Sequence, residues 1–331
     1  MNKPIGHGNN REKLKKLFAE NKLASTMLFT GTEGIGKLLV AKELAQTFFC
    51  LEKSNLIYGG CKNCKNCKLF EVNNLPDFHI VEARDKEVWN TESLRDLLYR
   101  LNLASFSGKY KVLVINDAEN IHNQAANVLL KSLEEPRPNM HYILISANPS
   151  KLPNTVISRC QVWNFNDLTI SEINEIIKDN FKLIENIDSK ILQDLVNYAS
   201  GSIKNLALIS ENFELWNKLN NILDDLVSGN KYVVNNFVQN ILKNSSGGDL
   251  TIILELIQNI TRSKMIRAKN LYEQNYWANI LHNSCLSFYY INQRNLNAKY
   301  LLTQILISSP DDLETIIKNN IDINYLENVI V

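Results

Sequence analysis

A glycine-rich run at residues 31–37 carries the residue types that bind phosphate. It reads Gly-Thr-Glu-Gly-Ile-Gly-Lys and matches the pattern G-x-x-x-x-G-K through Gly31, Gly36 and Lys37, with Gly34 as a further glycine. Glycines let backbone N–H groups turn toward phosphate oxygens, the positive end of a following helix faces them, and the lysine adds a point charge. A strand is expected before the run and a helix after it, so the sequence predicts a phosphate-binding loop.

Two positions around this loop lack the groups that hydrolysis needs. Leu38 stands where a Ser or Thr hydroxyl would hold Mg²⁺. Asp117 follows an apolar strand, as a metal-binding carboxylate should, but Ala118 occupies the next position, where a glutamate would polarise the attacking water. Glu119 is one position too far along and is expected to point elsewhere. We therefore predict weak or absent ATP binding and no turnover by this chain alone, with Asp117 reduced to a helix N-cap as the plainer alternative.

Cysteines form a second candidate site within residues 50–68. Cys61, Cys64 and Cys67 follow one another at x₂ spacing in CKNCKNCK, and Cys50 lies upstream. Four thiolates supply a closed tetrahedral Zn²⁺ site with Zn–S bonds of about 2.3 Å, and clustered cysteines in a reducing compartment indicate a metal rather than disulfides. We predict structural zinc. An iron–sulfur cluster or uncoordinated thiols are the alternatives, and the interleaved lysines are expected to be solvated.

Arg159 is the candidate for chemistry on a neighbouring subunit. It lies in Ser158-Arg159-Cys160, after a predicted buried strand at 142–145. In a P-loop domain this position is at the domain edge, away from the chain's own phosphate loop. A planar guanidinium there suits the spread charge of a γ-phosphate held by an adjacent subunit. A surface or salt-bridged arginine without such a role is the alternative.

The elements that must position these residues alternate between strands and helices in the first half of the chain. This pattern predicts a parallel sheet with flanking helices. The expected strands are 26–30, 79–83, 112–115 and 142–145, and the expected helices are 10–21, 38–49, 92–102 and 121–135. After about residue 165 only helices are expected, namely 169–181, 189–199, 203–210, 212–227, 231–243, 249–271, 275–292 and 296–307.

Composition limits the functional classes. The 331 residues are 45% hydrophobic, which allows a large core, and Lys+Arg is 36 against Asp+Glu 35. That balance gives no bulk electrostatic drive toward nucleic acid or membrane. No apolar run approaches the roughly 18 residues of a membrane span, and the N-terminus lacks the apolar core of a signal peptide. We expect a cytoplasmic protein that makes no membrane contact.

Four stretches in this order carry a family resemblance. They are the phosphate loop, the four-cysteine insert, Ala-Asn-Val-Leu-Leu-Lys-Ser-Leu-Glu-Glu-Pro at 126–136, and Leu-Pro-Asn-Thr-Val-Ile-Ser-Arg-Cys at 152–160. The chain resembles bacterial DNA polymerase III clamp-loader subunits of the AAA+ superfamily, and most closely those of the delta-prime type. The motifs cover about residues 5–210, and the helical C-terminal third agrees only in size and type.

The resemblance implies three domains. They are an AAA+ α/β core with the cysteine module at 1–165, a small helical lid at 166–210, and an all-α collar that oligomerises at 211–331. It also implies that the four cysteines hold zinc and that Arg159 completes an ATP site on a neighbouring tau/gamma subunit. Tau/gamma subunits keep a hydroxyl after the P-loop lysine and an acidic pair after the strand, so Leu38 and Ala118 favour delta-prime. Lys204 replaces a usual sensor arginine in the lid, which makes nucleotide sensing doubtful.

Three functions remain as hypotheses. The leading one is a non-hydrolysing stator of the clamp loader, within the DNA polymerase III holoenzyme, that works with tau/gamma and delta subunits to load the sliding clamp on primed DNA. The second is an active, tau/gamma-like ATPase that uses Lys37, Asp117 and a water-held Mg²⁺. The third is a zinc-dependent nucleic-acid-binding module, which the near-neutral charge disfavours.

Overall fold

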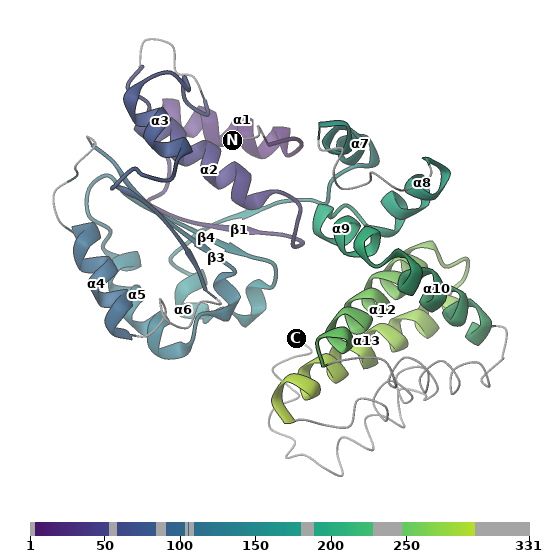
Figure 1. Ribbon diagram of the computed structural model, residues 1–331. Helices are drawn as coiled ribbons and strands as arrows, with labels where there is room; N and C mark the ends of the chain where they lie inside the picture. The colour runs from purple at the N-terminus through teal and green to yellow at the C-terminus, as the bar shows by residue number, and fades with distance from the viewer. Residues whose placement is uncertain are drawn as a thin grey trace. The chain divides into compact units, whose positions relative to one another are not determined.

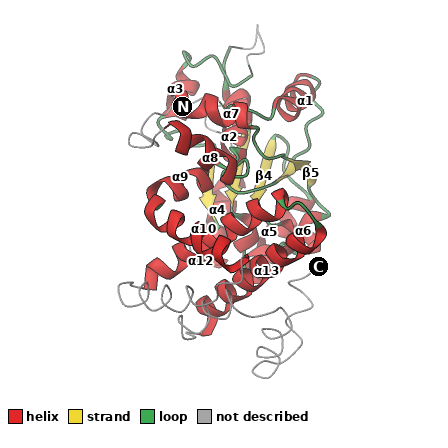
Figure 2. Cartoon of the chain, turned by 90° about the vertical axis from the view of Figure 1, so that its right-hand side faces the viewer, coloured by secondary structure: helices red, strands yellow, loops and turns green. Residues whose placement is uncertain are grey.

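The chain divides into two units, Met1–Ile176 and Ile177–Val331. The computed structural model describes residues 4–52, 58–83, 91–102, 105, 109–179, 189–227 and 247–294 (Figure 1). Within these ranges, every strand belongs to the N-terminal unit (Figure 2). In the same ranges, no helix has both the length and the apolar character of a membrane span.

Five parallel strands form the sheet of the N-terminal unit, in the order β2-β3-β4-β1-β5 (Figure 1). β1, β3 and β4 are almost continuously buried because both faces of a parallel sheet are covered by helices. The strands are β1 (Thr26–Thr30), β2 (Phe78–Glu82), β3 (Lys111–Asn116), β4 (Met140–Ser146) and β5 (Gln161–Asn164).

Helices cover both faces of this sheet (Figure 1). On one face lie α1 (Gly8–Ala19), α2 (Lys37–Phe49) and α3 (Lys65–Glu71). On the other lie α4 (Thr91–Asn102), α5 (Asn123–Glu134) and the short α6 (Asn154–Ile157). The second layer buries a leucine-rich core, and each buried leucine contributes about 1.5–3 kcal/mol. Its central members are Leu94, Leu98, Leu101, Leu113, Leu129 and Leu133.

The fold class predicted from the sequence is confirmed. The four predicted strands and the helices between them all form, with ends that coincide or differ by at most two residues. The prediction missed β5, whose Gln161, Val162 and Asn164 are exposed, because a short edge strand lacks an apolar run. Within the cysteine-rich segment 50–68, α3 begins at Lys65, whereas no helix was expected there from the sequence.

Helices make up the described part of the second unit. They are α8 (Ser189–Tyr198), α9 (Ile203–Glu211), α10 (Phe213–Val227), α12 (Gly247–Arg267) and α13 (Leu271–Arg294), and α7 (Ile170–Asp179) crosses the boundary between the units. α12 packs against the other four and buries Leu256, Ile257 and Ile260 completely. The predicted helices at 231–243 and 296–307 lie outside the described residues, and the three-domain division at 165 and 210 stays a prediction.

Candidate functional site

The phosphate loop connects β1 to α2 and requires its glycines. Gly31, Gly34 and Gly36 have φ angles of 139°, 78° and 101°, a region that side chains strongly disfavour. A Cβ on Gly31 would lie 2.3 Å from the carbonyl oxygen of Phe165. The predicted turn between strand and helix is therefore present, with the helix N-terminus directed at the loop.

Lys37 is turned into this loop. Its side chain is almost fully buried, and Nζ donates hydrogen bonds to the carbonyl oxygens of Gly31 and Thr32, each at 2.6 Å. Burial lowers the pKa of Lys37, and nearby carboxylates, that of Glu119 first, raise it in the opposite direction. Lys37 thus stabilises the loop through hydrogen bonds to two of its carbonyl oxygens.

His7 also contacts the loop, a contact that was not predicted from the sequence. Its Nε2 donates to the carbonyl oxygen of Ile35 at 2.7 Å, and its ring packs edge-on against Phe165 with centroids 5.0 Å apart. The contact joins residues 28 positions apart. Spacing patterns cannot reveal such a contact, and the only local hint was a glycine on each side of the histidine.

The acidic side of the site is incomplete, as expected. Asp117 follows β3 with φ 52° and leads into the 3₁₀ turn Ala118–Asn120. Its side chain makes no capping hydrogen bond, so the plainer N-cap role is not fulfilled. Ala118 is fully buried, and a methyl group cannot activate water.

Glu119 departs from the sequence prediction, which placed it away from the site. Its Oε1 accepts a hydrogen bond from the backbone N–H of Ala147, at the end of β4, at 3.2 Å. Its Oε2 is buried without a hydrogen-bond partner in the described structure. Among the carboxylates, Glu119 raises the pKa of Lys37 the most.

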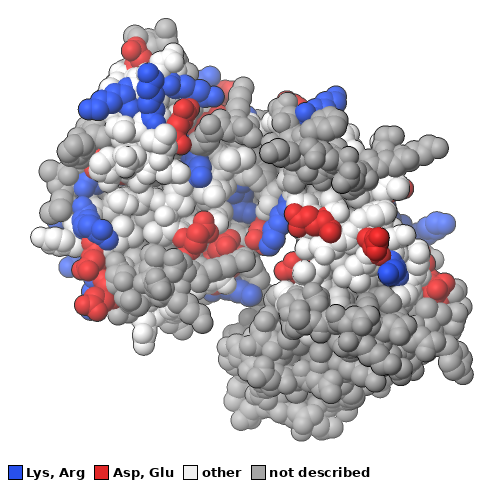
Figure 3. Space-filling model, viewed as in Figure 1, with Lys and Arg blue, Asp and Glu red and all other residues white. Residues whose placement is uncertain are grey.

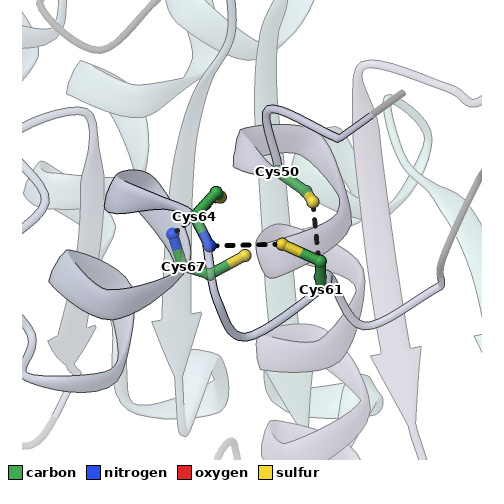
Figure 4. A group of neighbouring side chains, drawn as sticks. All are labelled: Cys50, Cys61, Cys64 and Cys67. Atoms are coloured by element: carbon green, nitrogen blue, oxygen red, sulfur yellow. Dashed lines mark hydrogen bonds between the residues drawn. The ribbon is translucent and has the colours of Figure 1, made fainter. Parts of the chain in front are cut away.

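The four cysteines form one cluster (Figure 4). Their Sγ atoms all lie within 4.8 Å of one another. A tetrahedral centre with Zn–S bonds of about 2.3 Å places its sulfurs about 3.8 Å apart, so the cluster fits a metal ion in donor type, number and spacing.

Backbone N–H groups are directed at these sulfurs. The N–H groups of Cys61 and Cys64 donate to Cys50 Sγ and Cys61 Sγ at 3.3 Å, and that of Cys67 donates to Cys64 Sγ at 3.5 Å. The N–H groups of Cys64 and Asn63 lower the pKa of the Cys61 thiol to about 7, whereas burial raises the pKa values of Cys50 and Cys67. Donors that favour thiolates are thus in place around the site.

The insert is attached to α2. Cys50 is the C-cap of α2, and Asn66 Nδ2 donates to the carbonyl oxygen of Phe49 at 3.1 Å. The N–H of Gly59 donates to Thr47 Oγ1 at 2.8 Å. Gly60 has φ 74°, and a Cβ there would lie 2.8 Å from Cys67 Sγ.

Lysines surround the outside of the insert. Lys62, Lys65 and Lys68 are exposed, and Lys and Arg side chains gather over the end of the unit that carries α3 (Figure 3). They match the solvated lysines that the sequence predicted.

Arg159 lies at the opposite end of the parallel strands from the phosphate loop. β5 runs parallel to β1, with Gln161 beside Met27 and Asn164 beside Thr30. Arg159 precedes β5, whereas the loop follows β1, so about one strand length, roughly 16 Å, separates them along the sheet. The arginine therefore does not serve its own loop.

The guanidinium is held at the surface by three contacts. Nη1 donates to the carbonyl oxygen of Thr155 at 2.7 Å and to Ser158 Oγ at 3.5 Å, and Nη2 forms an ion pair with Glu134 at the end of α5. The side chains of Arg159 and Glu134 are 29% and 48% exposed. The salt-bridged arginine foreseen as an alternative is thus present, and it remains accessible to a partner.

Comparison with known proteins decides the family. The family model described as DNA polymerase III, delta subunit, matches residues 6–169. DNA polymerase III subunit delta' of Bacillus subtilis is 32% identical over 198 residues, which cover 59% of this chain and 56% of that protein. The chain belongs to the DNA polymerase III clamp-loader family.

A tau/gamma subunit and one solved structure are also similar to this chain. The tau/gamma subunit of Haemophilus influenzae is 28% identical over 223 residues, which cover 67% of this chain and 30% of that protein. The crystal structure of a gamma subunit-related protein from Thermotoga maritima aligns with a TM-score of 0.49 at 19% identity, covering 89% of this chain and 97% of that one. The chain spans about half the length of the delta' relative and less than a third of the tau/gamma relative. All the predicted site residues lie within the range that the clamp-loader family model matches.

Proposed function

We propose that this chain is a delta-prime-type subunit of the clamp loader, which does not hydrolyse ATP and donates Arg159 to an ATP held by a neighbouring tau/gamma subunit. The observation that carries the proposal is the position of Arg159. It is accessible, it lies at the end of the strands opposite its own phosphate loop, and its guanidinium is oriented by three contacts.

The condition of the chain's own loop supports the same proposal. Lys37 binds two carbonyl oxygens of the loop that should receive phosphate. Leu38 offers no oxygen to Mg²⁺, and Ala118 offers no base to water. A triphosphate would have to displace the lysine from its buried hydrogen bonds and would then find no complete metal site, so we propose that ATP binds weakly or not at all.

The chemistry of the trans arginine follows from its shape and charge. A guanidinium presents parallel N–H donors that match the equatorial oxygens of a γ-phosphate, and its charge stabilises the negative charge that spreads over them during transfer. Such a residue contributes about 10³–10⁵ in rate. Hydrolysis by the neighbour would then release the sliding clamp on primed DNA, with delta as a further subunit of the complex and residues 211–331 as the collar that holds the subunits together.

Zinc completes the proposal as a structural ion. Cys50, Cys61, Cys64 and Cys67 would hold it, and four sulfur ligands leave no open position for catalysis. The ion would link the loop after α2 to α3 and would take no part in phosphate chemistry.

The test is reconstitution of the loader from this chain and the tau/gamma and delta subunits of the same organism. We expect Arg159→Ala to assemble normally. The clamp- and DNA-stimulated ATPase rate should fall by at least about 10³ if this arginine serves every active site. If it serves one site, only the share of the rate that this site contributes should be lost. Lys151→Ala, which removes an exposed cation from the neighbouring turn Pro149–Lys151, is the control. A wild-type rate with Arg159→Ala would exclude the finger role.

The runner-up, an active ATPase, is favoured by one observation. The buried, unpartnered oxygen of Glu119 lies on the side of the loop lysine and could take part in water or metal binding. If that role were real, the purified chain would hydrolyse ATP by itself, and both Glu119→Gln and Lys37→Ala would abolish the activity. We expect the purified chain to show no turnover above that of a Lys37→Ala control.

A further inference from the structure

The ion pair between Arg159 and Glu134 joins the two most specific motifs of the chain, which are separated by 25 residues. Glu134 ends α5, in the run Leu-Glu-Glu-Pro, and Arg159 follows α6 in Ser-Arg-Cys. α5 and α6 are in contact. The half-buried Cys160 packs against the core beneath them and donates from Sγ to the carbonyl oxygen of Val156 at 3.2 Å. The backbone on both sides of the pair is therefore fixed.

The orientation of the guanidinium is determined by these neighbours. Nη1 is bonded to the carbonyl oxygen of Thr155 and to Ser158 Oγ, and Nη2 is bonded to the carboxylate of Glu134, while Nε is buried and has no hydrogen-bond partner. The Nε edge thus faces inward and the two Nη groups face the surface. Each Nη group carries two N–H bonds, so one N–H of Nη2 remains for a phosphate that approaches from outside.

Glu134 occupies a place that local helix energetics disfavour. A carboxylate in the last turn of a helix opposes the helix dipole, at a cost of about 0.3–1 kcal/mol. Glu135 follows directly, so two acidic residues stand where cations are preferred. Glu134 is unfavourable for its own helix and yet pairs with a specific residue elsewhere in the fold, which indicates that its role lies in that contact.

We infer that Glu134 is the positioning residue for Arg159, holding its guanidinium plane so that the remaining N–H of Nη2 meets the γ-phosphate of the neighbouring subunit. This inference rests on the proposed trans role of Arg159. The pair is partly exposed, and such pairs contribute only about 0–1 kcal/mol to stability. Its effect is therefore on the direction of the side chain and not on the fold, and it leaves the guanidinium able to adjust as the phosphate binds.

The experiment uses the reconstituted loader and four variants of this chain: Arg159→Ala, Glu134→Ala, Glu134→Gln and the control Glu135→Ala. Glu135 is the adjacent exposed carboxylate. We expect Glu134→Ala to lower kcat of the stimulated ATPase by about 10- to 100-fold, because a misplacement of about 1 Å has effects of that size. KM for ATP and assembly should stay unchanged. Glu134→Gln keeps an acceptor for Nη2 and should lose less, and Glu135→Ala should match wild type.

A double variant separates positioning from a general structural role. If Glu134 acts only through the arginine, Arg159→Ala/Glu134→Ala should be no slower than Arg159→Ala alone. The inference is overturned if Arg159→Ala is slow while both Glu134 variants match Glu135→Ala, or if the two losses multiply in the double variant. If Glu134→Ala fails to assemble, the isosteric Glu134→Gln decides by the same comparison. If Arg159→Ala itself is at wild-type rate, the proposed function fails, and that outcome is distinct from the others.

Discussion

The phosphate loop and the cysteine cluster lie at the two ends of α2, and they differ in where their polar groups point. In the cysteine cluster, backbone N–H groups are directed at three of the sulfurs, so the site favours the charged ligand atoms that a metal requires. In the phosphate loop, Lys37 is bonded to carbonyl oxygens of the loop itself. One site is arranged for an external ion, and the other is satisfied internally.

The difference shows that a motif and its function can separate within one domain. The glycines of the loop remain necessary, because their φ angles and the closeness of Phe165 exclude side chains. They now maintain a junction between β1, α2 and the segment after β5. This junction is a structural reason for the loop to keep its shape even where a neighbouring subunit carries out the phosphate chemistry. The comparison predicts that substitutions in the cysteine cluster abolish ion binding, whereas substitution of the loop lysine lowers stability and leaves the ATPase rate unchanged.

The largest expected effect is loss of the metal from the cysteine cluster. Cys67→Ser removes a buried ligand, so we expect the zinc content measured by mass spectrometry to fall from about one ion per chain to near zero. Thermal stability should fall as well. Cys285→Ser, which changes an exposed cysteine outside the cluster, should retain the ion. Retention of full zinc by Cys67→Ser would show that the cluster is not the site.

An intermediate effect is expected at Gly60. Gly60→Ala forces a side chain into φ 74° with its Cβ 2.8 Å from Cys67 Sγ. Strain of about 1–3 kcal/mol corresponds to a loss of zinc affinity of about 10- to 100-fold, since about 1.4 kcal/mol is a factor of ten. Competition with a chromogenic chelator measures it. Gly8→Ala, where a Cβ would meet nothing within 4 Å, should leave the affinity unchanged. Equal affinities for the two variants would contradict the proposed fit.

The smallest functional effect is expected at Lys37. Lys37→Ala leaves two loop carbonyls without their donor, at a cost of about 1–3 kcal/mol, so Tm should fall by several degrees. The ATPase rate of the reconstituted loader should stay within about twofold of wild type, in contrast to Arg159→Ala. A rate that fell as steeply with Lys37→Ala would place ATP in this loop and reverse the comparison.

The sequence predicted those features whose residues lie close together along the chain. The P-loop spacing, the x₂ cysteine series and the alternation of apolar strands with amphipathic helices each depend on neighbours within a few residues. They predicted the turn at Gly31, the cluster at Cys61–Cys67 and the order of the elements correctly. The missing groups at Leu38 and Ala118 could also be identified from position alone.

The sequence was uninformative where residues meet across the fold. The contacts of His7 with Ile35, Glu119 with Ala147 and Glu134 with Arg159 span 25–28 residues and follow no period. Position alone could not show that the chain turns at Asp117 and that Glu119 meets the backbone of Ala147. β5 was missed because its exposed polar residues leave no apolar run in the sequence.

Arg11 and Glu43 form an ion pair between α1 and α2. Both guanidinium bonds are 2.7 Å long, and they tie α1 to the middle of α2, next to Gly59 of the insert. α2 has 13 residues and is about 20 Å long, and it carries the phosphate loop at its N-terminus and Cys50 at its C-terminus. The ion pair at its midpoint therefore fixes the one helix on which both sites depend.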